Sequence, residues 1–320
     1  MRGLFLFLTL ICILSSCTKN IHKEGLLWEI SGNGLKQSSY ILGTGHGFTG
    51  EFLARIPRFT QAFDSVSQLI VEVDMDFQQK TIPEFEELKV NNFLPKEITY
   101  SDLLTPEDLL FLDSLTVGYL NTTIDKVTLK PDALYKELCN KIISEETPET
   151  MPKDSFPEEH PARYMAGFTK KLFMDMHLYN EAKTRGYNTI GLETLEYQIK
   201  LKLQPDISLK LETKSLLYKL KNGEYIAEAM MNVIYSYFDQ DLNRMMDNFD
   251  SITRLSGLSD SYVLSPIDEI KKRNLNWISP IKSAIENESS MIAVGAGHLP
   301  GGWGLINLLR GQGYIVEEFK

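Results

Sequence analysis

Two copies of a Gly-x-Gly-His motif lie near opposite ends of this chain, and each follows an apolar segment. The first copy is Gly43–His46 and the second is Gly295–His298. A histidine imidazole can act as a general base or bind a metal ion. Ligands of open α/β sheets bind outside the carboxyl ends of the strands. The repeat therefore predicts that both imidazoles lie at the mouth of one crevice. The backbone at Gly43, Gly45, Gly295 and Gly297 would leave room there for a ligand.

A carboxylate interrupts a third apolar segment, Leu69–Val73, at Glu72. An ionised carboxylate among buried side chains needs a cation, a histidine or an arginine as partner. Two histidines and one glutamate form a recurrent ligand set for divalent metals. The sequence therefore predicts that His46, Glu72 and His298 meet and bind a metal ion, although the HExxH spacing of common zinc proteases is absent.

The segment Gly45–Gly50 also fits the spacing G-x-G-x-x-G between a predicted strand and a predicted helix, which is the pattern of dinucleotide-binding turns. The side chain of His46 would project where a pyrophosphate has to approach, and a hairpin precedes the strand in place of the usual βαβ unit. We therefore disfavour a nucleotide site.

The elements that must position these residues follow from hydrophobic periodicity. Segments 26–30 and 38–42 flank Gly32-Asn33-Gly34, a hairpin signature. Single helices are predicted over 51–66 and 162–185, and further strands over 68–74, 188–193, 291–294 and 314–319. The fold class is therefore α/β, with a central, mostly parallel sheet, flanking helices and a large helical insertion at about 78–186.

The N-terminus has the features of an export signal. Arg2 precedes the apolar run Leu4–Leu14, and the following Leu14–Cys17 resembles a bacterial lipobox. This resemblance implies cleavage before Cys17 and lipidation of its thiol; a plain secretory signal is the alternative. The predicted organisation is a signal peptide over 1–16, a lipidated tether over 17–25 and one domain over 26–320. The protein would be exported and anchored to a bacterial membrane, on the periplasmic or cell-surface side. Cys139 would remain as a structural thiol without a disulfide partner.

The charge balance excludes one class of partner. The chain has 43 acidic residues against 33 lysines and arginines, and a net charge of −10. Binding to nucleic acid needs clustered positive charge, so we expect no nucleic-acid partner. The expected partners are a peptide or small-molecule substrate and, through the lipid, the membrane.

The chain resembles the TraB/GumN group, which includes the Tiki metalloproteases. The resemblance rests on the two Gly-x-Gly-His motifs and on further segments: 69–74, the helix around Asp175, the segment Gly191–Gln198, Arg273-Asn274, and the C-terminal segments 304–309 and 313–316. It implies a fold like that of the erythromycin esterase and haem-binding ChaN superfamily. For the Tiki branch it implies a protease that depends on a divalent metal, with manganese, cobalt or zinc as candidates.

The resemblance also implies roles for residues of this chain. His46, Glu72 and His298 would bind the metal and activate water, and Arg273 would stabilise an oxyanion or orient Glu72. Asp175 and Asn274 would contact these ligands and orient them, and Glu193 would either do the same or be a further ligand. The sequence thus predicts a lipid-anchored hydrolase, foremost a metal-dependent peptidase. Two alternatives stay open: a metal-independent, esterase-like hydrolase with a histidine as general base, and a non-catalytic lipoprotein that binds peptide or haem.

Overall fold

The computed structural model describes residues 23–76, 92–146, 156–166, 171–203, 208–255 and 266–320. The predicted signal peptide and Cys17 lie outside these residues. Within them, every helix is too short or too polar to cross a bilayer.

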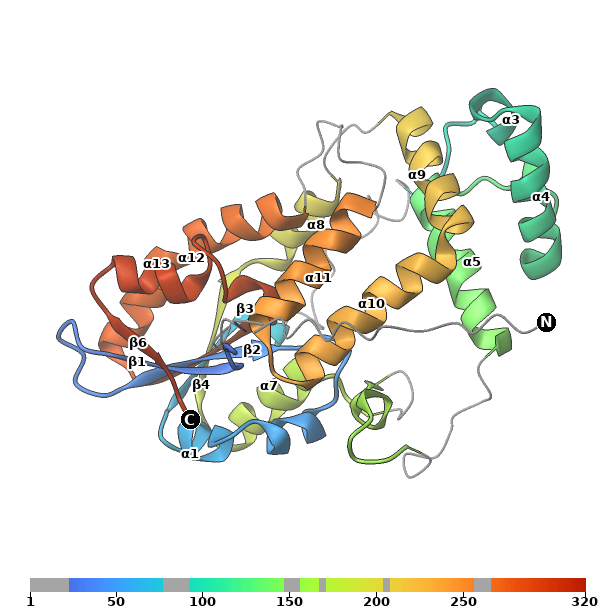
Figure 1. The fold of residues 1–320 in the computed structure, drawn as a ribbon. Coiled ribbons are helices and arrows are strands. Elements are labelled where there is room, and N and C mark those ends of the chain that lie inside the picture. Colours follow the sequence, from blue (N-terminus) through green and yellow to red (C-terminus); the bar gives the residue numbers. More distant parts are fainter. Residues whose placement is uncertain (1–22, 77–91, 147–155, 167–170, 204–207, 256–265) are drawn as a thin grey trace, which may run out of the picture.

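A six-stranded sheet forms the centre of the protein, in the order β4-β3-β5-β2-β1-β6 (Figure 1). The strands are β1 (Leu27–Ser31), β2 (Ser39–Thr44), β3 (Gln68–Val73), β4 (Asn188–Glu193), β5 (Ser290–Gly295) and β6 (Ile315–Glu318). Strands β4, β3, β5 and β2 run parallel, whereas β1 is antiparallel to both β2 and β6. The predicted α/β fold with a mostly parallel sheet is confirmed.

Helices cover both faces of the sheet, so its central strands are buried. Helices α12 (Pro266–Asn287) and α13 (Leu305–Gly311) lie on one side, and α1 (Phe59–Asp64) and α7 (Met174–Thr184) on the other (Figure 1). Every residue of β2 and β5 is consequently buried, as expected for parallel strands enclosed by helices.

The hairpin prediction is confirmed, whereas the two long-helix predictions are wrong. Strands β1 and β2 pair around Gly32, Asn33 and Gly34, all with positive φ. Residues 51–66 form the 3₁₀ helix η1 (Gly50–Arg55) and the separate α1, because Pro57 lacks an amide hydrogen and Arg58 has a left-handed φ of 55°. Residues 162–185 divide into the 3₁₀ helix η5 (Pro161–Tyr164) and α7, since Met165 and Phe173 pair in extended conformation with the loop after β2.

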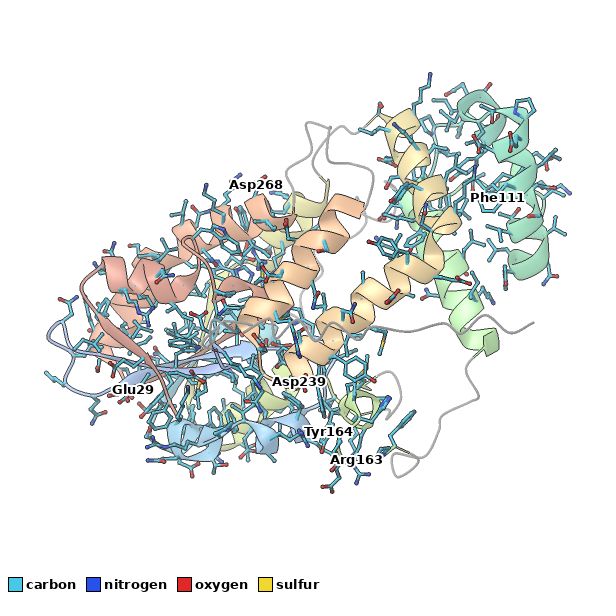
Figure 2. The ribbon with its side chains drawn as sticks, in the orientation of Figure 1. Glu29, Phe111, Arg163, Tyr164, Asp239 and Asp268 are labelled. Atoms are coloured by element: carbon cyan, nitrogen blue, oxygen red, sulfur yellow. The ribbon has the colours of Figure 1, made fainter. Side chains whose placement is uncertain are left out.

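A helical lobe with its own apolar core lies beside the sheet. It comprises α3 (Tyr100–Leu103), α4 (Pro106–Leu120), the 3₁₀ helix η3 (Ile124–Lys126), α5 (Pro131–Glu146) and α9 (Leu209–Lys221). The antiparallel pair α10 (Gly223–Phe238) and α11 (Leu242–Leu255) leads back toward the sheet. Figure 2 shows Phe111 in the lobe and Asp239 beside the sheet, at opposite ends of this connection. Helix α8 (Leu195–Leu203) follows β4, and the 3₁₀ helix η6 (Ala296–His298) follows β5.

Candidate active site

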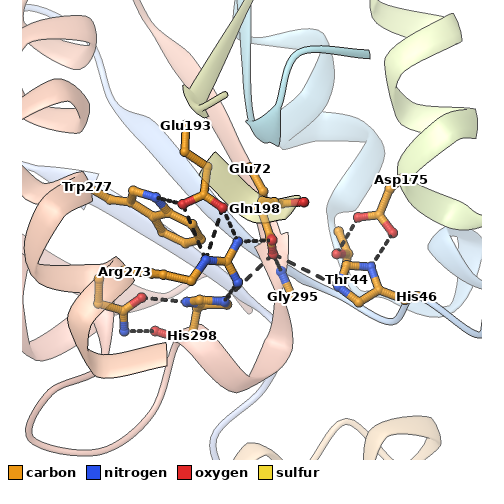
Figure 3. A network of polar contacts seen from close by, with 11 residues as sticks. Thr44, His46, Glu72, Asp175, Glu193, Gln198, Arg273, Trp277, Gly295 and His298 are labelled. Atoms are coloured by element: carbon orange, nitrogen blue, oxygen red, sulfur yellow. Dashed lines mark hydrogen bonds and ion pairs between the residues drawn. The ribbon is translucent and has the colours of Figure 1, made fainter. Parts of the chain in front are cut away.

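The carboxyl ends of β2, β3 and β5 bring three predicted residues together. His46 follows the last residue of β2 by two positions, Glu72 lies near the end of β3, and His298 ends η6 directly after β5. The distance from His46 Nε2 to Glu72 Oε1 is 4.0 Å, and from His298 Nε2 to the same oxygen 3.8 Å (Figure 3). Because β2, β5 and β3 are parallel neighbours, residues far apart in the sequence lie together at the same edge of the sheet.

Arg273 of α12 occupies the centre of this cluster. Its Nη2 donates to Glu72 Oε2 and to Glu193 Oε1, each at 2.6 Å. Its Nη1 lies 3.2 Å from His298 Nε2. The arginine side chain is only 12% exposed. Arg273 therefore orients Glu72, and it links the ends of β3, β4 and η6.

Glu193, the last residue of β4, holds the guanidinium in place. Its carboxylate accepts from Arg273 Nε at 3.0 and 3.3 Å, from Trp277 Nε1 at 3.0 Å and from Gln198 Nε2 at 2.8 Å. The Trp277 ring packs 4.6 Å from the Arg273 guanidinium carbon and 4.4 Å from the His298 ring. With four donors directed at it, this buried carboxylate anchors Arg273.

The hydrogen bonds around His298 fix its tautomer. Asn274 Nδ2 donates to the carbonyls of His298 and Trp303, both at 3.0 Å. The amide oxygen of Asn274 then faces His298 Nδ1 at 2.6 Å, so Nδ1 carries the proton and Nε2 accepts from Arg273. Burial lowers the pKa of His298 to about 4, and the ring is consequently neutral near pH 7.

His46 is paired with Asp175 of α7. The distance from His46 Nδ1 to Asp175 Oδ2 is 2.9 Å, and Thr44 Oγ1 donates to the other carboxylate oxygen at 2.6 Å. The hydrogen bond with Asp175 raises the pKa of His46. Burial opposes ionisation of Asp175, but the hydrogen bond with His46 lowers the pKa of this carboxyl. The His46 side chain is 68% exposed, so the oriented imidazole is accessible to solvent, and its Nε2 lies 4.0 Å from Glu72 Oε1.

Glu72 is held in its ionised form. Burial alone would raise its pKa, but the interactions with His298 and Arg273 and the hydrogen bond from the Gly295 amide lower it. That amide lies 2.8 Å from Glu72 Oε1. Both oxygens of Glu72 thus have donors before any ligand binds.

Among the four predicted crevice glycines, Gly295 borders the cluster directly. A methyl group on its Cα would lie 3.2 Å from His46 Nε2 and 3.3 Å from Glu72 Oε1. At Gly43 the methyl group would meet Ala296, at Gly45 the ring of Tyr237, and at Gly297 Ile270. Gly295 thus keeps a side chain out of the space between His46 and Glu72, and Gly43 and Gly45 permit close packing, whereas a methyl group at Gly297 would make an ordinary contact.

The donor set does not fit the predicted metal ion while Arg273 holds its present position. A metal bound by His46, Glu72 and His298 would need the Nε2 lone pair of His298 and an oxygen of Glu72. Arg273 donates to both groups, and the Gly295 amide donates to the second oxygen of Glu72. Within the described residues, no group of three or more His, Cys, Asp or Glu residues is arranged to hold a metal.

The residues that build this cluster all lie inside a range that matches a known protein family. Residues 26–318 match the sequence model of the TraB/PrgY/gumN family. The chain belongs to this family. TraB/PrgY/gumN membership confirms the resemblance drawn from the repeated Gly-x-Gly-His motif and from Glu72 and Arg273. Neither a curated protein nor a solved structure gives a significant match to the chain.

Sequence reasoning missed two members of the network in this TraB/PrgY/gumN protein. Trp277 follows Arg273 by four residues, the spacing that places side chains on one face of a helix. That spacing could have indicated a pair. Thr44 is the variable position of the first Gly-x-Gly-His motif, and only its contact with Asp175 from α7 reveals its role.

Proposed function

We propose that this TraB/PrgY/gumN protein is a hydrolase of peptide or ester bonds, with His46 as its general base. The observation that carries the proposal is the contact between His46 Nδ1 and Asp175 together with the exposure of the His46 side chain. A carboxylate at one ring nitrogen orients an imidazole and stabilises its protonated form, while the other nitrogen accepts a proton.

In the proposed reaction, His46 Nε2 takes a proton from a water molecule whose oxygen attacks the substrate carbonyl carbon. The carbon–oxygen bond that forms creates a tetrahedral intermediate with a negatively charged oxygen. Arg273 supplies positive charge near this oxygen. The protonated His46 then gives its proton to the leaving amine or alcohol as that bond breaks, which restores the neutral imidazole and releases a carboxylic acid.

Purified protein incubated with mixtures of peptides and of esters would test the proposal, with products identified by mass spectrometry. We expect His46→Gln to lower the rate of hydrolysis by about 10²–10⁴-fold. His177→Gln, which changes an exposed histidine on α7, should leave the rate unchanged. Full activity in His46→Gln would refute the assignment. Tight binding of intact peptide without turnover would favour the non-catalytic alternative.

We also propose that the hydrolase is exported and carries a lipid on Cys17, as the lipobox-like segment Leu14–Cys17 indicates. Growth with a labelled fatty acid would test this. The label should appear on the wild-type protein and be absent from Cys17→Ser, while Cys139→Ser should keep it. Equal labelling of both variants would refute lipidation at Cys17.

A further inference from the structure

His46, Glu72 and His298 lie near one another, although the three groups as they stand are not arranged to hold a metal ion. The position of a methyl group on Gly295 lies 3.2 Å from His46 Nε2 and 3.3 Å from Glu72 Oε1, so these donors border a common space. Two zinc ligands at about 2.1 Å in a tetrahedral site lie roughly 3.4 Å apart. The observed separations of 4.0 and 3.8 Å would therefore have to shorten only slightly.

The outer hydrogen bonds of both histidines also match those of metal ligands. Metal-binding histidines usually donate their second ring N–H to a carboxylate or a carbonyl oxygen. His46 Nδ1 contacts Asp175, and His298 Nδ1 contacts the amide oxygen of Asn274. Each Nε2 is thereby directed toward Glu72.

Arg273 nevertheless already uses groups that the ion would need. Its Nη1 donates to the lone pair of His298 Nε2, and its Nη2 donates to Glu72. A guanidinium does not lose its proton in proteins, so it cannot yield these positions by deprotonation. Its positive charge would also repel a divalent cation bound by His298 and Glu72.

The guanidinium is not free to move aside. Three hydrogen-bond contacts and the ring of Trp277 hold it against Glu193. The Glu193 side chain is 6% exposed, and moving Arg273 would leave this buried charge without its cationic partner. The fold therefore holds the Arg273 guanidinium in its present position.

We infer that Arg273 is a built-in substitute for a divalent metal: the wild-type site excludes the ion, and removal of the guanidinium creates a metal site from His46, Glu72 and His298. This inference does not depend on the proposed hydrolase activity, because it concerns binding alone. It differs from the family resemblance, which implied that His46, Glu72 and His298 bind a metal ion in the wild type.

Metal binding by the purified protein tests the inference without any substrate. Zn²⁺ and Mn²⁺ are titrated by calorimetry into the wild type, Arg273→Ala and the double variant Arg273→Ala/His46→Ala, and bound metal is counted by elemental analysis after dialysis. We expect no saturable binding by the wild type. Arg273→Ala should bind one ion per chain, and the double variant should lose at least tenfold in affinity.

Thermal unfolding supplies a second measurement. Zn²⁺ should raise the melting temperature of Arg273→Ala and leave that of the wild type unchanged, because a ligand stabilises only the state that binds it. If Arg273→Ala does not fold, Arg273→Gln, which keeps amide donors for Glu193, takes its place. One equivalent of metal bound by the wild type and lost in His46→Ala would overturn the inference. A folded Arg273 variant that binds no metal would overturn it as well.

Discussion

Acid should destabilise the folded protein through His298, and the structure sets the size of the effect. Burial lowers the pKa of this histidine from 6.5 to about 4, whereas an unfolded chain leaves it near its usual value. The unfolded state therefore binds the proton first as the pH falls, and the free energy of unfolding decreases between these two values. Linkage gives a loss of about 2 kcal/mol between pH 6.5 and pH 4.5 from this one group.

Urea unfolding of the wild type and of His298→Gln at several pH values would measure this loss. Tryptophan fluorescence is a suitable signal, since one of the three tryptophans, Trp277, has its ring 4.4 Å from the His298 ring. The wild type should lose about 2 kcal/mol more than His298→Gln over this range, while His177→Gln should follow the wild type. Parallel pH dependence of the wild type and His298→Gln would show that His298 is not held neutral by burial.

Three further predictions concern the same network. The hydrogen bond to Asp175 raises the pKa of His46, so the kcat/KM of the wild type should rise with pH through a midpoint above 6.5. In a pH–rate profile, Asp175→Asn should move this midpoint to lower pH. Glu193→Ala leaves the buried Arg273 with one carboxylate fewer and should lower the free energy of unfolding by about 3–5 kcal/mol in urea titrations; a loss below about 1 kcal/mol would contradict the anchoring role. Gly295→Ala places a methyl group 3.2 Å from His46 Nε2, so hydrolysis should fall at least tenfold, while circular dichroism should keep its helical signal; an unchanged rate would mean that this space is not used.

The meeting of His46, Glu72 and His298 could be expected from the sequence, because it depends on one general property of parallel sheets. Residues that follow parallel strands emerge at the same edge of the sheet, whatever their distance along the chain. The strands themselves were recognisable as short apolar segments bounded by turn residues. The two-histidine repeat then marked two of the strand ends, and the embedded carboxylate marked the third.

The position of Arg273 could not be derived from local sequence alone. It follows Lys271-Lys272, and such a basic run usually marks a solvent-exposed helix face. Its burial depends on Glu193 and Trp277, and thus on how α12 packs across the end of β4. The lobe presents the same difficulty, since α9 from after β4 packs against α5 from before it. The two predictions of continuous helices failed for a more local reason. Pro57 and the left-handed Arg58 stop one helix, and Met165 and Phe173, which lie between η5 and α7, pair with the loop after β2.

The protonation states in this site have different causes, and Arg273 contributes to two of them. Together with His298 and the Gly295 amide, Arg273 lowers the pKa of Glu72 against the effect of burial, so this carboxyl stays ionised near pH 7. The same guanidinium donates to His298 Nε2 and repels a proton there, which adds to the effect of burial on a ring that already prefers to be neutral. His46 is paired with the carboxylate of Asp175, and this hydrogen bond raises the pKa of the imidazole above 6.5. Of the three predicted ligands, His46 is thus the group that can take up and release a proton near neutral pH, which is the property that a general base requires.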